Sequence, residues 1–362
     1  MQHPLCARYY WEMVAFHHFA VATSHTLPGC HLPALHACWS VHAPRLALDD
    51  EPLFNQLVAL ACLHLMVTER DHHDILGLAA CREVYLDAAL RVHRETLGQL
   101  GCAHNRRTAD AVSLTSILLI VDIVAGMQTR QLASDTNEYE PPVQWLRMVR
   151  GTRSVVLAAC AQGASDEDNN GTDDAHSHLK TTTTMTVIST IKKSALYFAD
   201  PVNFVTEDNL NQFRYLLPAD DDNDDHRDGD GDDNDDDDDD AMGETKEAYR
   251  VTVAYVGAMR TAAEEANAPG GQPVLALCRR VMAFASVVPG RFAELVEQRA
   301  PRALVILAHF FALAAPAREV WWVGGMPVRE VEAIYAHISP AMRPLMAWPL
   351  QAIASCKANR EM

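Results

Sequence analysis

The sequence predicts an all-α fold, a multi-helix bundle with acidic insertions, and three observations support this. Apolar residues make up 49% of the 362 residues, which is enough for a sizeable core. They recur with the helical period along most of the chain. No alternating strand pattern of useful length is present, and the strand–helix rhythm of parallel-sheet enzymes is absent.

Two helices are expected early in the chain. Pro52, a residue that suits the first turn of a helix, opens a run over 53–66 that is apolar almost all round and should therefore be central. A long amphipathic helix should follow over 74–100 and stop at Gly101. One face of this helix should contain Leu86, Leu90, His93, Leu97 and Leu100.

Further helices are expected over 105–127 and 142–161, and beyond residue 241 over 244–266, 273–288, 291–299 and 302–315. Residues 181–188 fit either one short strand or part of a helix. A turn with two tryptophans and two glycines, 321–327, should end at Pro327, which starts the next helix. We expect Val331, Tyr335 and Ile338 to share one face of that helix, which Ser339-Pro340 should end.

Two acidic segments should be disordered insertions. Residues 163–178 are small, polar and acidic, and residues 219–240 contain 15 Asp and a single Arg, so they carry most of the formal charge of −18. The predicted organisation is an N-terminal helical part over 1–218, with a flexible loop at 163–178, then the Asp-rich insertion 219–240 and a C-terminal helical part over 241–362.

The composition argues against several classes of protein. The nine cysteines are odd in number and include no C-x-x-C pair, which is typical of reduced thiols in an intracellular protein. The N-terminus shows no secretory signal. The chain is too acidic to neutralise phosphates, so we expect no direct contact with nucleic acid. The apolar runs 112–124 and 303–315 are shorter than the ~20 residues of a spanning helix, so we expect no membrane span.

No catalytic or metal-binding constellation stands out. Nucleophile elbows, phosphate loops and H-E-x-x-H are absent, so we expect no enzyme, no catalytic residue and no cofactor. The densest group of zinc-type ligands lies within 30–42, where Pro33 and Pro44 suggest a loop and a buried Cys38 is expected instead of a metal. That group comprises Cys30, His31, His36, Cys38 and His42.

The Asp-rich insertion only partly fits a calcium loop. Asp228, Asp230 and Asp232 have the alternating ligand spacing, but Asp233 and Asp239 replace the Gly and Glu that the loop requires. A solvated acidic segment is the favoured interpretation. The turn around Trp321 and Trp322 has two interpretations that remain open, a connection anchored by tryptophans or the rim of an apolar pocket.

Several stretches form a specific set through their order and spacing. The N-terminal blocks are FHHFAVATS at 16–24, Trp39, APRLAL at 43–48, LVALACLHL at 57–65, and Tyr85 with AAL at 88–90. The C-terminal blocks are AHFFAL at 308–313, WWVGG at 321–325 and Trp348-Pro349. Together they resemble the regulatory domain of fungal zinc-cluster (Zn2Cys6) transcription factors of the sterol uptake control type. The six-cysteine cluster of the family has no counterpart in this sequence, so the resemblance implies the regulatory part without the zinc-dependent DNA-reading part.

The resemblance implies a regulator of fungal RNA polymerase II genes that responds to a small apolar ligand such as a sterol. The nucleus, with exchange with the cytoplasm, is the expected location, and protein partners or a second copy are expected. The alternative is a helical protein-interaction domain without a ligand. The expected pocket residues are Trp321, Trp322, Gly324, Gly325, Phe310, Phe311 and Tyr335.

Overall fold

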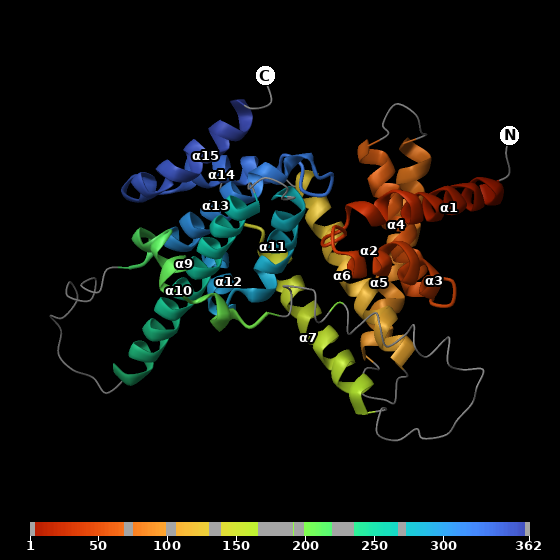
Figure 1. The fold of residues 1–362 in the computed structure, drawn as a ribbon, viewed down its shortest axis with the longest axis horizontal. Coiled ribbons are helices and arrows are strands. Elements are labelled where there is room, and N and C mark those ends of the chain that lie inside the picture. The colour runs from red at the N-terminus through yellow and green to blue at the C-terminus, as the bar shows by residue number, and fades with distance from the viewer. Residues whose placement is uncertain are drawn as a thin grey trace. The chain divides into compact units, whose positions relative to one another are not determined.

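The computed structural model describes residues 4–68, 75–98, 106–129, 139–165, 191, 199–218, 235–266 and 273–358. Within these ranges the backbone forms helices joined by turns and contains no β-strand, which confirms the predicted all-α fold (Figure 1). The predicted alternative of a strand at 181–188 lies outside the described residues.

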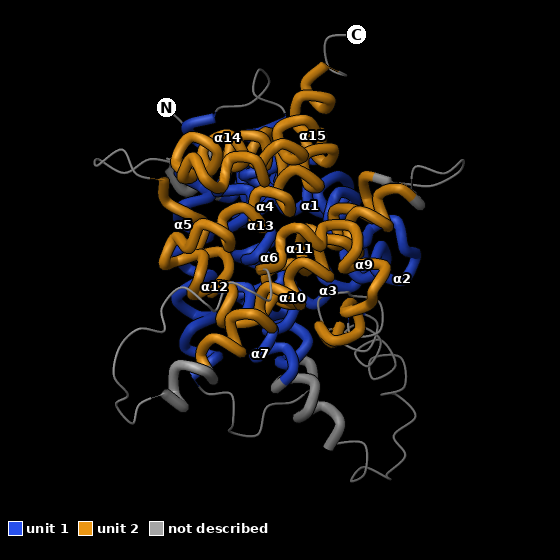
Figure 2. Tube along the Cα trace, turned by 90° about the vertical axis from the view of Figure 1, so that its left-hand side faces the viewer, with its two compact units in different colours: residues 1–127, 148–197, 320–322 blue, residues 128–147, 198–319, 323–362 orange. Residues whose placement is uncertain are grey.

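The chain divides into two compact units, each assembled from separate stretches of sequence (Figure 2). Unit 1 comprises Met1–Met127, Met148–Tyr197 and Val320–Trp322. Unit 2 comprises Gln128–Arg147, Phe198–Glu319 and Val323–Met362. Unit 2 thus includes residues on both sides of the predicted insertion 219–240.

In unit 1 the central helix is α4 (Glu51–Thr68), as its all-round apolar sequence predicted. The Asp50 carboxylate accepts a hydrogen bond from the backbone N–H of Leu53 at 3.0 Å, and Pro52 occupies the first turn. Residues 57–62 are completely buried. The helix packs against α1 (Pro4–Val21), α5 (Ile75–Gly98) and α6 (Arg106–Gly126).

The buried face of α5 differs from the predicted one. It consists of Leu78, Cys81, Tyr85, Ala89 and His93. Of the predicted stripe only His93 is fully buried, while Leu86, Leu90 and Leu97 are half-buried and Leu100 lies outside the described residues. Small side chains such as Cys81 and Ala89 let α5 approach α4 closely, and this places the larger leucines on the flanks.

The prediction of a loop around Pro33 and Pro44 is wrong. This region forms η1 (Thr23–Thr26), α2 (Pro33–Ala37), a π-helical turn η2 (Cys38–His42) and α3 (Ala43–Ala47). Both prolines lie in the first turn of a short helix, where the missing N–H has no partner to lose. Cys38 is completely buried, as predicted.

Two helices of the described part are long and apolar enough to cross a membrane, judged by length and composition alone. They are α4 and the 19 residues Thr108–Gly126 of α6, which corrects the length argument made for the run 112–124. The windows concerned are 61% and 83% buried inside the structure. A third membrane span would require two helices to count as one, Gly290–Glu297 and Pro301–Glu319, which are bent by 107° relative to each other.

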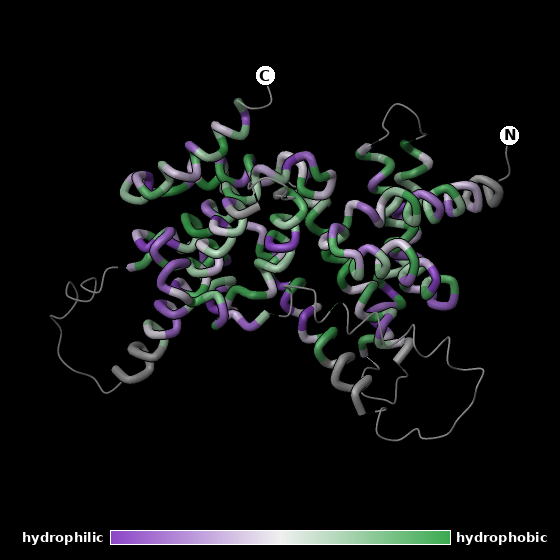
Figure 3. The backbone as a smooth tube through the Cα atoms, viewed as in Figure 1, coloured by the Kyte–Doolittle hydropathy of each residue, from purple (hydrophilic) through white to green (hydrophobic). Residues whose placement is uncertain are grey.

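Unit 2 is organised around α13 (Pro301–Ala314), which is buried from Ala303 to its end. The helices α10 (Asp235–Ala266), α11 (Pro273–Val287), α12 (Gly290–Glu297), α14 (Met326–His337) and α15 (Ala347–Ala358) pack on it (Figure 1). Most helices show both purple and green turns in Figure 3, as expected for helices with an exposed and a buried side.

The helices predicted in the C-terminal part and over 142–161 are confirmed, the latter as α7 (Val143–Ser165). Helix α10 begins at Asp235, before the expected 244, so residues 235–240 of the predicted insertion are helical. Acidic residues stabilise the N-terminal end of a helix through its dipole. The first residues of the predicted loop 163–178 continue α7 to Ser165, and the rest lie outside the described residues.

Candidate functional site

Phe310 and Phe311, two of the predicted pocket residues, lie in a buried group of rings in unit 2. The rings, which we call the aromatic cluster, come from α7, α10, α11, α12 and α13. The ring centroids of Phe284 and Phe310 are 3.8 Å apart and those of Phe310 and Phe311 are 5.1 Å apart. The members of the aromatic cluster are Trp145, Tyr255, Phe284, Phe292, Phe310 and Phe311.

Trp145, which the sequence did not single out, lies against three of these rings. Its indole stacks on Phe284 and Phe310, at 5.9 and 5.8 Å between centroids, and tilts against Phe311 at 6.4 Å. The side chain is only 3% exposed, and its Nε1 atom has no hydrogen-bond acceptor in the described structure.

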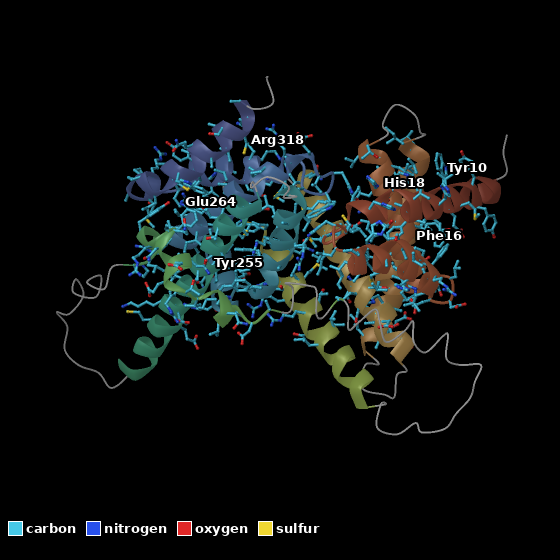
Figure 4. The ribbon with its side chains drawn as sticks, viewed as in Figure 1. Tyr10, Phe16, His18, Tyr255, Glu264 and Arg318 are labelled. Carbon is cyan, nitrogen blue, oxygen red and sulfur yellow. The ribbon has the colours of Figure 1, made fainter. Side chains whose placement is uncertain are left out.

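Tyr255, labelled in Figure 4, is the other polar member of the cluster. Its hydroxyl donates a hydrogen bond of 2.8 Å to the carbonyl oxygen of Arg280. Burial raises the pKa of Tyr255 well above its usual value, so the phenol is neutral. No ring of the aromatic cluster carries a charge, so the cluster offers dispersion contacts and apolar surroundings rather than acid–base chemistry.

Trp321 and Trp322 lie in unit 1 and both hydrogen-bond to Thr26. The indole N–H of Trp321 donates to the Thr26 hydroxyl at 2.8 Å, and that of Trp322 donates to the Thr26 carbonyl at 3.0 Å. Trp321 also stacks on His64 at 4.6 Å. These contacts fit the anchored-turn interpretation of the sequence, whose partner Thr26 no sequence signal could reveal.

His64 connects this site to α1. His64 Nδ1 lies 2.9 Å from the Thr23 hydroxyl and 3.2 Å from His18 Nε2. Figure 4 labels His18 near the end of α1, with Phe16 and Tyr10 further toward the N-terminus. His17, the neighbour of His18 in the sequence, is exposed, because adjacent residues on a helix point in different directions.

Of the remaining predicted residues, Gly324 and Gly325 lie just before α14 and Tyr335 lies in its last turn. Gly324 has φ +53°, and a Cβ there would lie 2.6 Å from Gln128 Cδ, so only glycine fits this position. Gly325 precedes α14 and has open space around it. Tyr335 is 37% exposed, with the Arg343 guanidinium 5.6 Å from its ring centroid, so it does not lie on the buried face of α14 as expected.

The predicted residues therefore form separate groups. Phe310 and Phe311 belong to the aromatic cluster of unit 2, whereas Trp321 and Trp322 belong to unit 1. The exposure of Tyr335 has a local reason, because the buried face of α14 follows Pro327, Glu330, Val331 and Ile334, and Tyr335 falls beside it.

A second group of aromatic residues in unit 2 surrounds His309 on α13. His309 Nδ1 donates to the carbonyl of Val305 at 2.8 Å, so its Nε2 accepts the hydrogen of the Tyr215 hydroxyl, also at 2.8 Å. Trp348 stacks on the imidazole at 5.4 Å between centroids. Burial lowers the pKa of His309 to about 4. Both ring nitrogens have partners, so we interpret this histidine as structural.

The described residues include no group of three or more His, Cys, Asp or Glu side chains that could hold a metal ion. Burial raises the pKa of Cys38 to about 12 and also raises that of Cys30, and this disfavours the thiolates that zinc binds. Asp228, Asp230, Asp232 and Asp233 lie outside the described residues.

The chain is similar to two fungal proteins named Zn(2)-C6 fungal-type transcription factors. It is 33% identical over 300 residues to one from Aspergillus fumigatus, covering 83% of this chain and 66% of that protein. It is 24% identical over 351 residues to one from Gibberella zeae, covering 94% of this chain and 61% of that protein. The chain thus spans less than two thirds of either relative. No protein-family model matches it.

Proposed function

We infer that this chain, a homologue of fungal Zn(2)-C6 transcription factors over most of its length, is a transcription-regulator domain. The homology agrees with the resemblance to fungal zinc-cluster transcription factors, and the sterol uptake control type remains part of the proposal. We propose further that the domain acts in the nucleus on genes transcribed by RNA polymerase II, that it has no enzymatic activity, and that a small apolar ligand controls it.

The aromatic cluster of unit 2 is the observation that supports a ligand. Helix α13 is buried on all sides and contributes two adjacent phenylalanines, Phe310 and Phe311. Because neighbours on a helix point in different directions, their two rings extend from different sides of α13. Trp145 and Phe284 extend this surface from α7 and α11. These rings are buried in the described structure. A rigid apolar molecule of the sterol class that inserts among them would exchange water for ring contacts, at about 25 cal/mol per Å² of apolar area buried.

The alternative, a helical protein-interaction domain without a ligand, has support from α1. Tyr9, Met13 and Val21 are 62%, 71% and 56% exposed, and with the exposed His17 they recur every four residues along the helix. Such a stripe is typical of a helix face that binds another protein. It does not compete with the aromatic cluster, since the two features lie in different units.

Thermal unfolding with ergosterol delivered from cyclodextrin tests the ligand. We expect a saturable rise in the melting temperature, because a ligand that binds only the folded state stabilises it. Phe310→Leu and Phe311→Leu should reduce the rise, since they remove aromatic contacts while keeping the core filled. The control Tyr335→Ala, at an exposed aromatic of the predicted set, should leave the rise unchanged.

A reporter assay tests the regulatory role. The chain fused to an unrelated DNA-binding domain should change transcription of a reporter, and ergosterol depletion should alter this effect in the wild type more than in Phe311→Leu. A reporter response without any sterol-dependent shift in melting temperature would favour the interaction domain. No response at all in the reporter assay would contradict the proposed function.

A further inference from the structure

Trp145 differs from the other buried tryptophans in the described structure. Four tryptophans are less than a tenth exposed, and three of them donate their indole N–H. Trp39 donates to the carbonyl of Pro28 at 3.3 Å, and Trp321 and Trp322 donate to Thr26. The N–H of Trp145 has no acceptor. An unmet buried donor destabilises a fold, and among the buried tryptophans only Trp145 has one.

The rings that contact Trp145 supply no acceptor for its N–H. Phe284 and Phe310 lie on the same side of the indole, since their own centroids are 3.8 Å apart, and their interplanar angles to it are 14° and 25°. Phenylalanine rings carry no oxygen or nitrogen. Stacking also fixes the plane of the indole, so the direction of its N–H, which lies in that plane, is fixed as well.

The only other polar side chain in the cluster has its hydrogen committed elsewhere. The Tyr255 hydroxyl donates to the carbonyl of Arg280. An anion is a poor candidate for the missing acceptor, since moving a carboxylate among neutral rings costs far more than one hydrogen bond returns. A neutral oxygen fits both the single donor and its apolar surroundings.

We propose that the indole N–H of Trp145 donates a hydrogen bond to a neutral oxygen of the bound ligand. The site then selects apolar molecules that carry a hydroxyl or carbonyl group over hydrocarbons of the same shape. This inference rests on the proposed function, since it assigns a specificity-determining residue to the same aromatic cluster. The rings of the aromatic cluster select the ligand by its shape. The N–H of Trp145 selects a ligand that carries an oxygen, and it fixes the orientation of that ligand.

The test compares two probes that differ only in the oxygen, ergosterol and its deoxy analogue, in which hydrogen replaces the hydroxyl group. Dissociation constants are measured by partition from cyclodextrin for the whole chain and for Trp145→Phe. This variant keeps an aromatic ring for stacking and removes the N–H. The wild type should bind ergosterol about 3- to 10-fold more tightly than the deoxy analogue, the range for one neutral hydrogen bond.

In Trp145→Phe that preference should disappear. The variant should bind ergosterol more weakly than the wild type does, and it should bind the deoxy analogue at least as tightly as it binds ergosterol. Phe311→Leu serves as the matched control, because it removes one ring contact of Trp145 and keeps the indole N–H itself. It should weaken both probes by the same factor and keep the preference. If Trp145→Phe fails to fold, benzothienylalanine at position 145 replaces the N–H with sulfur in a side chain of nearly the same shape.

The outcomes separate this inference from the proposed function. Equal binding of both probes by the wild type, or an equal loss of both in Trp145→Phe, would overturn the role of Trp145 and leave ligand binding intact. Failure of the wild type to bind either probe would overturn the proposed ligand site itself, and the role of Trp145 with it.

Discussion

Lowering the pH from about 7.5 to about 5 should destabilise unit 2 through one buried imidazole, that of His309. The folded protein keeps His309 neutral, because burial lowers its pKa from 6.5 to about 4 while the hydrogen bond to Val305 opposes this only in part. Arg260, whose guanidinium lies 5.7 Å from the Trp348 ring that stacks on His309, adds a nearby positive charge. Protonation would also turn Nε2 from an acceptor into a donor facing the Tyr215 hydroxyl.

The sign and size follow from proton linkage. The unfolded chain binds the proton at its ordinary pKa of 6.5, and the folded state binds it only near 4. The stabilising contribution is therefore fully present above pH 6.5 and is lost as the pH falls toward 4. Between pH 7.5 and pH 5 the loss amounts to about 2 kcal/mol for this group, a large part of the stability of an ordinary domain.

Urea unfolding at the two pH values, followed by circular dichroism, measures the effect. Other groups also titrate in this range, including His93 in unit 1, whose pKa burial likewise lowers to about 4. The variant His309→Gln isolates the contribution, because its amide oxygen can still accept from Tyr215 but has no proton to gain. The stability advantage of the wild type over His309→Gln should shrink by about 2 kcal/mol at pH 5. An advantage of the same size at both pH values would refute the reasoning.

Two further predictions concern packing and anchoring. Gly257→Ala should destabilise unit 2 by about 1–3 kcal/mol, since the added Cβ would lie 2.7 Å from the carbonyl carbon of Asn209. The control Gly243→Ala on the same helix meets open space and should be neutral or stabilising. Thermal unfolding measures both variants, and equal melting temperatures would contradict the prediction. Thr26→Val should cost about 1–3 kcal/mol, because Trp321 loses its acceptor and the hydroxyl loses its own hydrogen bond to the carbonyl of Thr23, whereas Thr26→Ser should keep both. Equal unfolding free energies for the two Thr26 variants would show that these two hydrogen bonds contribute nothing.

The sequence was most informative where local signals agree with one another. Helix α4 could be predicted because Pro52 and an unbroken apolar run both indicate it. The region 33–47 could not, because a proline that starts a short helix and a proline in a loop look alike in sequence. The face of α5 was misjudged because hydrophobicity favours leucine, whereas close approach of two helices favours small residues such as Ala89.

Of the candidate site, only the residues that are neighbours in the sequence could be predicted. Phe310 and Phe311 stand in an apolar run and form part of the aromatic cluster. Trp145 is far from them in sequence. No local pattern predicts which tryptophan will lack a hydrogen-bond acceptor, because this depends on how α7, α11 and α13 pack together. For the turn around Trp321 the sequence left an anchored connection and a pocket rim open, and its partners Thr26 and His64 became known only from the fold.

The interleaving of the two units limits how the protein can be cut. A nick within 219–234 yields two fragments, neither of which contains a complete unit. The N-terminal fragment lacks Val320–Trp322 of unit 1 but holds Gln128–Arg147 of unit 2, and with it Trp145. Each fragment would expose apolar surface that the other should cover, so we expect the two to remain associated after proteolysis and to regain structure only when refolded together.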